Sequence, residues 1–579
     1  MPLPPRRSFA GLALTTLTAL TTLAALGSLS GCTAAPKTPT SPSATAESPR
    51  LVVFMVIDGL PMRQVTGYRD LLQPDGFRRF LDRGVWFSEA HYGHAHTVTA
   101  AGHATMLTGA YPQRSGIISN EWVDPQTRQP VYNTMDPAYH YIGHKTAALA
   151  GTSPRMLLAE TVGDVLRSRD PGSKVIGISG KDRGAILPAG HKGTAYMFMS
   201  ETGRFASTSY YMPAHPDWVE SFNASGAAEA FFGKAWAPAL PGYDCPSSER
   251  SCPYARSVPD GQSWQSQDGL GNRLPATLGA GLKAPAASYY ASLLPSPFGD
   301  ELTLQFARAA LAGEQLGSDD KPDILSISLS SHDYVNHAFG PESRLSQDHL
   351  LHLDRLLQAF FRDLDQRVGR DRYLLVLTAD HGFADTPEWA ASQGRDAKRL
   401  PGKQLVAFAN QGLSKSLGEG PWVTGLSAMG MLFDEALIRR RGLEPAKVYA
   451  EARRVMLQHP DVEAAYTPEE LAGSDAAPKL LAQMRKSWHP DRAAPLQVIM
   501  KQGRLFGSRP QGSSHGTPWR YDTHVPLLAW GERWVGQGEV KTPVEIADLA
   551  PSLSAILGLR APAQSQGQAL PWPRAAKVP

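Results

Sequence analysis

The segment HTVTAAGHATMLTG, residues 96–109, gathers side chains that could do chemistry. It holds four threonines and two histidines among small residues. A threonine hydroxyl is a weak nucleophile unless a base or a metal ion activates it. The segment therefore predicts a nucleophilic site only if activating groups come from elsewhere in the chain.

Carboxylates and histidines recur next to apolar, strand-like runs. These residues are Asp58, Asp333, His337, Asp380, His381 and His515. Each alone could be a turn or helix-cap residue. Together, a mixed Asp/His set without cysteine suits Zn²⁺ best, with Mn²⁺ or iron as alternatives. Two metal ions about 4 Å apart can clamp the attacking and leaving oxygens of a displacement at phosphorus. A threonine hydroxyl beside them would lose its proton more readily.

The apolar runs predict the strands of a sheet that is covered on both faces. They span residues 51–57, 174–180, 323–329, 373–379, 404–410 and 525–531, and helical patterns span residues 301–312, 346–368 and 544–557. This alternation predicts an α/β fold with a doubly wound, mostly parallel sheet. Ligands of such sheets bind beyond the carboxyl ends of the strands, where the candidate residues lie.

The predicted catalytic domain spans residues 51–579 and contains two irregular regions. Residues 183–298 are rich in Gly, Pro, Ser and aromatic residues and predict a loop-rich insertion or cap. Residues 424–512 predict a second irregular insertion. Cys245 and Cys252 lie in the first region, and in an exported protein they predict a disulfide, with a metal-binding pair as the alternative.

The N-terminus predicts export. Arg6 and Arg7 precede an apolar run that ends in LSGC at Cys32, which resembles the bacterial lipobox. Residues 1–31 are therefore predicted to be a lipoprotein signal peptide, with an ordinary signal peptide or a membrane anchor as alternatives. A Pro/Ser/Thr-rich linker follows over residues 32–50. We expect a periplasmic or cell-surface lipoprotein, and Thr33, in place of Asp, favours the outer membrane.

Composition adds an expectation about partners. The formal net charge is +3, and 19% of residues are charged. Such a balance gives no electrostatic reason to expect binding to nucleic acid or to an anionic membrane. Membrane contact is expected only through a lipid on Cys32.

The ordered motifs resemble those of a known family. They are VFMVIDG, TVTAAGHATMLTGAYPQRSGIISNEW, KDRGAILPAGH, DYVNHAFGP, LTADHG and HGTPWRYDTHVPLLAWG. From about Leu51 to Leu557 the chain resembles the alkaline phosphatase superfamily, which includes type I phosphodiesterases and nucleotide pyrophosphatases. It is most similar to the bacterial phosphate-irrepressible alkaline phosphatases.

The resemblance implies roles for individual residues. Thr99 would be the nucleophile that forms a phosphothreonine intermediate, while Thr97, Thr105 and Thr108 would shape the structure. Two Zn²⁺ ions are implied: one is held by Asp58, Thr99, Asp380 and His381, and the other by Asp333, His337 and His515. His515 is preferred to His524 as a ligand because it precedes glycine, as the family motif requires.

Three further residues would bind the phosphoryl group. The resemblance implies that Asn120, Lys181 and Arg183 contact phosphate oxygens that the metal ions do not reach. Charge-assisted hydrogen bonds of this kind suit a phosphomonoester dianion. The alternative for KDRG, residues 181–184, is a solvated charged turn.

The expected function is zinc-dependent hydrolysis of phosphomonoesters. The alternative within the superfamily is a phosphodiesterase or nucleotide pyrophosphatase, which needs room for a second ester group. A sulfatase is disfavoured because the chain has no Cys-x-Pro-x-Arg motif. A binding protein with a degenerate site is disfavoured because every expected ligand is present.

Overall fold

The computed structural model describes residues 47–573 except 246–248, 250, 255–269 and 507–510. The predicted signal peptide, the predicted lipidation site Cys32 and most of the linker lie outside these residues. Within them, no helix is both long and apolar enough to cross a bilayer.

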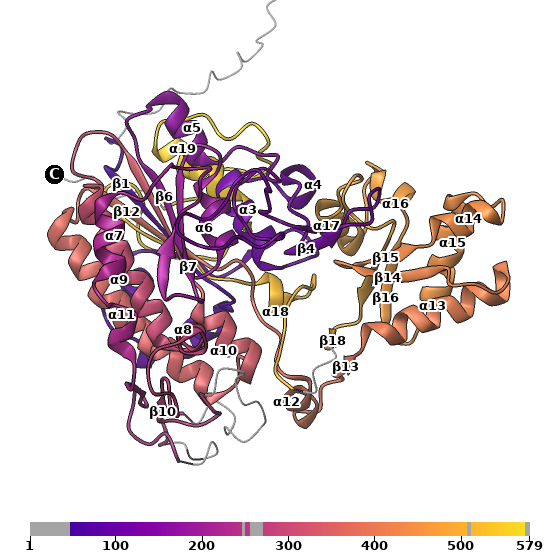
Figure 1. The fold of residues 1–579 in the computed structure, drawn as a ribbon, viewed down its shortest axis with the longest axis horizontal. Coiled ribbons are helices and arrows are strands. Elements are labelled where there is room, and N and C mark those ends of the chain that lie inside the picture. The colour runs from indigo at the N-terminus through magenta and orange to yellow at the C-terminus, as the bar shows by residue number, and fades with distance from the viewer. Residues whose placement is uncertain (1–46, 246–248, 250, 255–269, 507–510, 574–579) are drawn as a thin grey trace, which may run out of the picture. The chain divides into compact units, whose positions relative to one another are not determined.

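A nine-stranded sheet forms the centre of the catalytic region (Figure 1). Its order is β20 (Gly538–Val540), β2 (Val85–Phe87), β19 (Leu527–Trp530), β12 (Tyr373–Thr378), β1 (Leu51–Ile57), β11 (Asp323–Leu329), β6 (Val175–Ser179), β7 (Thr194–Met199) and β8 (Arg204–Ala206). The pairs from β12 through β1, β11 and β6 to β7 are parallel. The pairs that involve β19, and the β7–β8 pair, are antiparallel. The predicted α/β fold with a mostly parallel sheet is confirmed.

Helices cover both faces of this sheet, as expected for strands that are buried along their whole length. In Figure 1, α9 (Pro297–Gly313) and α11 (Arg344–Arg367) lie on one side of the strands, and α3 (Thr99–Thr108) and α6 (Asp182–Ala189) lie on the other. All residues of β1, β11 and β12 are buried. Burial on both faces explains why these strands read as continuous apolar runs.

A smaller antiparallel sheet has its own hydrophobic core. Its order is β14 (Val423–Ser427), β15 (Gly430–Phe433), β17 (Leu496–Met500) and β16 (Val462–Tyr466). It packs with α13 (Gly402–Leu417), α14 (Glu435–Arg440) and α15 (Pro445–Met456), and we call residues 402–500 the second lobe. The expectation of an irregular insertion over residues 424–512 was wrong for most of this span.

The strand predicted at residues 404–410 was also wrong, because these residues lie within α13. Leu405, Ala409 and Leu413 are buried at intervals of four residues, which is the period of a helix face. A short apolar run does not distinguish a strand from a buried helical segment.

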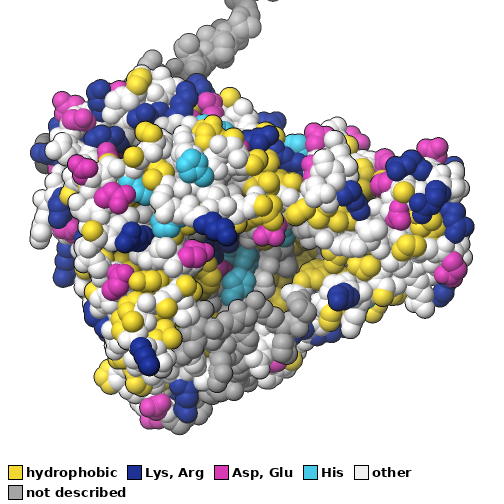
Figure 2. Space-filling view, viewed as in Figure 1, with side chains coloured by type: hydrophobic (Ala, Val, Ile, Leu, Met, Phe, Trp, Pro, Cys, Tyr) yellow, Lys and Arg dark blue, Asp and Glu magenta, His cyan; other side chains and the backbone are white. Residues whose placement is uncertain are grey.

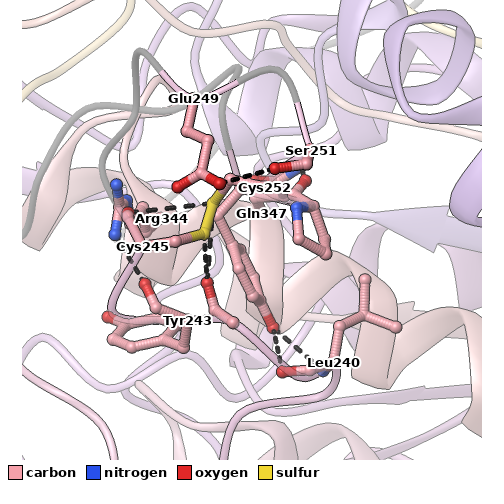
Figure 3. Close-up of a disulfide and its surroundings, with 11 residues drawn as sticks. Leu240, Tyr243, Cys245, Glu249, Ser251, Cys252, Arg344 and Gln347 are labelled. Carbon is pink, nitrogen blue, oxygen red and sulfur yellow. Dashed lines mark hydrogen bonds between the residues drawn. A yellow bond between two sulfur atoms is a disulfide. The ribbon is translucent and has the colours of Figure 1, made fainter.

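The region 183–298 contributes more regular structure than expected. Its first part forms helix α6 and the two strands β7 and β8, which belong to the main sheet. The rest holds short elements: α7 (Asp217–Ala224), β9 (Ala235–Trp236), β10 (Ala276–Thr277) and α8 (Ala287–Leu293). Cys245 and Cys252 are joined as a disulfide with their Cα atoms 5.9 Å apart (Figure 3). Nearby, Arg344 of α11 donates a hydrogen bond to the carbonyl of Tyr243.

Candidate metal centre and phosphate site

The candidate ligands come from the ends of three adjacent strands. Asp58 directly follows β1, and Asp380 and His381 follow β12. Asp333 and His337 lie one turn apart on α10 (Ser331–Phe339), which follows β11. Since β12, β1 and β11 are neighbours and run parallel, their carboxyl ends meet at one edge of the sheet.

The structure gathers these residues into two groups of three. Asp58, Asp380 and His381 offer ligand atoms within 4.8 Å of one another, and so do Asp333, His337 and His515. The groups adjoin: His381 Nε2 lies 3.9 Å from Asp333 Oδ1, and the rings of His381 and His515 stack with centroids 3.3 Å apart. The two sets coincide with the two predicted ligand sets, apart from Thr99.

Several buried atoms in these groups make no hydrogen bond to any described residue. They are Oδ1 of Asp58, Oδ1 of Asp333, Oδ2 of Asp380 and Nε2 of His381. Buried polar atoms without partners are costly, and they are rare in folded proteins. Lys181 Nζ lies 2.8 Å from Asp58 and 2.5 Å from Asp333. Its single positive charge does not balance the three carboxylates of the two groups. The residues present therefore fit divalent cations.

Electrostatics within the groups suits metal binding. Burial, followed by the negative charge of Asp380, raises the pKa of Asp58 well above its ordinary value. Burial also acts to raise the pKa of Asp333, but Lys181 and the surrounding histidines outweigh it and hold that pKa well below its ordinary value. Burial and the neighbouring His381 lower the pKa of His515, so its imidazole is neutral and can act as a ligand.

Thr99 is the first residue of α3 and is 1% exposed. The hydroxyls of Thr97, Thr105 and Thr108 donate to backbone carbonyls, as expected for residues that shape the structure. The Thr99 hydroxyl makes no hydrogen bond to any residue that the structure describes. Among the four threonines of residues 96–109, Thr99 is the one whose hydroxyl is not committed to the fold.

Asn120 lies beside the start of the same helix. Its Oδ1 accepts a hydrogen bond from the backbone N–H of Ala100, at 2.8 Å. This bond satisfies one of the free amides of the first helical turn. It also leaves the side-chain amino group of Asn120 as a donor next to Thr99.

Lys181 and Arg183 lie at the N-terminus of α6, and Lys181 is its N-cap residue. The Arg183 guanidinium donates to the hydroxyl of Tyr132, at 3.2 Å, and Tyr132 in turn donates to Asp182. The Arg183 Nε atom is buried without a hydrogen-bond partner among the described residues. The structure thus holds Lys181 against the carboxylate groups and buries most of the Arg183 side chain, so neither residue lies in a solvated turn.

Two further residues contact the site, and the sequence did not specify the partners of either. Tyr132, in β5 (Pro130–Tyr132), anchors Arg183, and no sequence pattern marks it. His103 Nδ1 lies 2.9 Å from the carbonyl oxygen of Thr99 and 3.3 Å from Asp380 Oδ2. Its spacing of four residues from Thr99 on a helix places it on the same face, which could have indicated this contact.

His524 lies apart from the two groups. Its ring stacks on His91 with centroids 4.7 Å apart, and its Nε2 bonds the carbonyl of Ser88. With Glu89 and His91 it forms a separate cluster of possible ligands. The preference for His515 over His524 therefore agrees with where the structure places them.

Comparisons with known proteins place the chain in a family. Residues 52–524 match the family described as type I phosphodiesterase / nucleotide pyrophosphatase, and the chain belongs to that family. Alkaline phosphatase PafA of Elizabethkingia meningoseptica is 31% identical over 528 residues, which cover 90% of this chain and 93% of that protein. Alkaline phosphatase PhoV of Synechococcus elongatus is 31% identical over 534 residues, with 91% and 93% covered.

A solved structure supports the same assignment. The crystal structure of wild-type alkaline phosphatase PafA matches with a TM-score of 0.81 at 31% identity, covering 90% of this chain and 98% of that chain. The resemblance to the alkaline phosphatase superfamily that the motifs predicted is confirmed.

Proposed function

We propose that this protein hydrolyses phosphomonoesters and releases inorganic phosphate. The observation that carries the proposal is the position of Lys181, whose ammonium lies against a carboxylate of each Asp/His group. With Arg183 two residues further on, it gives the site a cationic pair beside the metal-ligand groups. Such a pair suits the three nonbridging oxygens of a monoester dianion.

Thr99 is the proposed nucleophile. Its Oγ forms a bond to phosphorus while the bond from phosphorus to the ester oxygen breaks, and the alcohol leaves from the opposite side. Water then cleaves the phosphothreonine and releases phosphate. The Asn120 amide and the Lys181 and Arg183 side chains hold the phosphoryl oxygens, so positioning and charge do most of the work.

Two Zn²⁺ ions are the proposed cofactors, held by Asp58, Thr99, Asp380 and His381 and by Asp333, His337 and His515. When bound, they supply positive charge at the phosphoryl oxygens and favour loss of the threonine proton. Mixed carboxylate and imidazole ligands without thiolates are consistent with zinc.

The relatives support this assignment. PafA and PhoV are both named alkaline phosphatases. A further solved structure of PafA is of a mutant in which one threonine, one asparagine, one lysine and one arginine are replaced. The same four residue types, in the same order, make up the proposed set Thr99, Asn120, Lys181 and Arg183.

We also propose that the protein is exported and anchored through a lipid on Cys32, at the cell surface or in the periplasm. The LSGC motif after an apolar run supports this, and so does the Cys245–Cys252 disulfide, because disulfides persist in oxidising compartments. Mass spectrometry of the membrane fraction would detect the lipidated N-terminal peptide. Recovery of an unmodified Cys32 would contradict the anchor.

The family description favours a second candidate, a phosphodiesterase. Rates on para-nitrophenyl phosphate and bis-para-nitrophenyl phosphate separate the two, for the wild type and for Lys181→Ala/Arg183→Ala with zinc. We expect a strong monoester preference that collapses in the double variant. A diester preference, or unchanged discrimination in the variant, would support the phosphodiesterase.

A further inference from the structure

A cavity of about 720 Å³ lies beside the candidate metal centre. One part of its wall comes from the segment that carries His515, together with Ser514 and Gly516. The facing part comes from the second lobe. In Figure 2, hydrophobic side chains line a hollow in this face of the molecule, near exposed histidine atoms.

The second lobe gives the cavity an apolar wall. Its side chains there are Leu405, Leu426, Met429, Met431, Val498 and Met500. They come from α13, β14, β15 and β17 and from the turn between β14 and β15. Methionine side chains are flexible and polarizable, so such a wall can adapt to groups of different shape.

The two arginines that line the cavity are paired with carboxylates, and Asp522 is hydrogen-bonded through its Oδ2, while its Oδ1 has no partner among the described residues. Arg395 bonds Asp385 at 2.6 Å, and Arg504 bonds Asp396 at 2.5 Å. Asp522 accepts hydrogen bonds from both the backbone and the hydroxyl of Thr517. Among the described lining residues, no unpaired cation is left to attract an anionic ligand. The cavity therefore suits an uncharged, apolar group.

The position of His515 indicates which end of a substrate would enter. In an in-line displacement, the nucleophile and the leaving oxygen lie on opposite sides of phosphorus. The helix that begins at Thr99 packs against the backbone of Asp380, because a Cβ atom added at Gly102 would lie 2.1 Å from the Asp380 carbonyl oxygen. His515 belongs to the other ligand group, with Asp333 and His337, and it is the member of that group that lines the cavity.

We propose that this cavity binds the apolar leaving group of alkyl and aryl phosphomonoesters. The inference rests on the proposed phosphomonoesterase function and specifies its substrate class. Transfer of one methylene from water to an apolar site is favourable enough to tighten binding about fourfold. Affinity should therefore rise with chain length until the cavity is filled.

The direct test is calorimetry of zinc-loaded protein with methyl-, butyl- and octylphosphonate, which keep the anionic head but cannot be hydrolysed at a P–O ester bond. We expect octylphosphonate to bind at least about 100-fold more tightly than methylphosphonate, with a more negative heat-capacity change from apolar burial. The kcat/KM values of methyl and octyl phosphate should follow the same order.

A double variant locates the effect. Leu426→Gln/Met429→Gln places polar groups at two half-buried lining positions. It should remove most of the increase in alkylphosphonate affinity with chain length and leave the affinity for methylphosphonate unchanged. Leu457→Gln is the control, because Leu457 is 44% exposed and does not line the cavity.

The outcomes separate the two proposals. If methyl phosphate is hydrolysed but chain length has no effect, or if the double variant keeps the full gain, the cavity proposal is overturned and the phosphomonoesterase stands. If neither methyl nor octyl phosphate is hydrolysed and neither phosphonate binds, both proposals fall.

Discussion

The backbone of Asp380 touches Gly102. A Cβ atom added at Gly102 would stand 2.1 Å from the carbonyl oxygen of Asp380. The helix that begins with Thr99 can approach the strand end that carries Asp380 and His381 only because residue 102 has no side chain. The distance between the candidate nucleophile and its ligand group is therefore set by one glycine.

Gly102→Ala should lower kcat/KM by about 100-fold or more, because displacements near 1 Å at a catalytic centre have effects of that size. Initial rates on para-nitrophenyl phosphate would measure the loss. Gly67→Ala is a matched control in α1 (Met62–Gly67), where an added Cβ meets nothing within 4 Å. Wild-type activity in a folded Gly102→Ala protein would show that this contact does not set the geometry.

Two substitutions of Thr99 should distinguish the contribution of its hydroxyl to activity from that of its size. We expect Thr99→Ala to lose at least about 1,000-fold in kcat/KM, since it lacks a nucleophile, and Thr99→Ser to keep much of the activity. Phosphorylation of residue 99, trapped by acid quench and detected by mass spectrometry, would report the intermediate directly. Thr105→Val serves as the control, because its hydroxyl only bonds the carbonyl of Ala101. A Thr99→Ala protein with substantial activity would rule out the assigned role.

Metal removal should lower both activity and stability. Three buried carboxylates share one close lysine, so loss of the cations leaves the repulsion among Asp58, Asp333 and Asp380 only partly compensated. Chelation should abolish turnover and lower Tm by several degrees, and Zn²⁺ should restore both. In Asp333→Asn the bound zinc, measured by elemental analysis, should fall from about two ions to about one. Full activity and an unchanged Tm after chelation would contradict this.

Tyr132→Phe should weaken phosphate binding through Arg183. The variant removes the hydroxyl that accepts the arginine hydrogen bond and keeps the ring. We expect the inhibition constant of inorganic phosphate to rise roughly tenfold, the size of one lost charge-assisted hydrogen bond. The variant should have little further effect in an Arg183→Ala background. An additive loss there would mean that Tyr132 acts by another route.

Asp300 should make stability depend on pH. It is 1% exposed, and burial raises its pKa to about 7, whereas an unfolded aspartate titrates at about 3.9. Between these values the folded state binds the extra proton. The free energy of unfolding therefore falls as pH rises from about 4 to about 7.

Asp300→Asn removes this titration. Relative to the variant, the wild type should lose on the order of 4 kcal/mol of stability between about pH 4 and about pH 8. Urea unfolding of both proteins across this range measures the difference. A pH-independent difference would show that Asp300 keeps an ordinary pKa.

The sequence predicted the parts of the fold whose physical signal is local. The strands at residues 51–57, 323–329 and 373–379 are buried on both faces, so their apolar runs were unambiguous. The site could be predicted because Asp58, Asp333 and Asp380 lie within four residues after the ends of those strands. The strand prediction for residues 404–410 was wrong because these residues form one face of a helix that packs against the core of the second lobe. The sequence does not reveal that core. The Tyr132–Arg183 contact joins residues that only the tertiary fold brings together.

The lysine that bridges Asp58 and Asp333 has a thermodynamic consequence. Lys181 lies against both carboxylates and offsets part of their charge; bound cations would take over this role and would free the ammonium to meet a phosphoryl oxygen. The occupancy of one site then alters the affinity of the other, and such linkage is reciprocal. Metal loading should raise the affinity for phosphate, and phosphate should slow the loss of metal by the same coupling free energy. A phosphatase of this design would thus hold its metal ions most firmly while the phosphate product is bound.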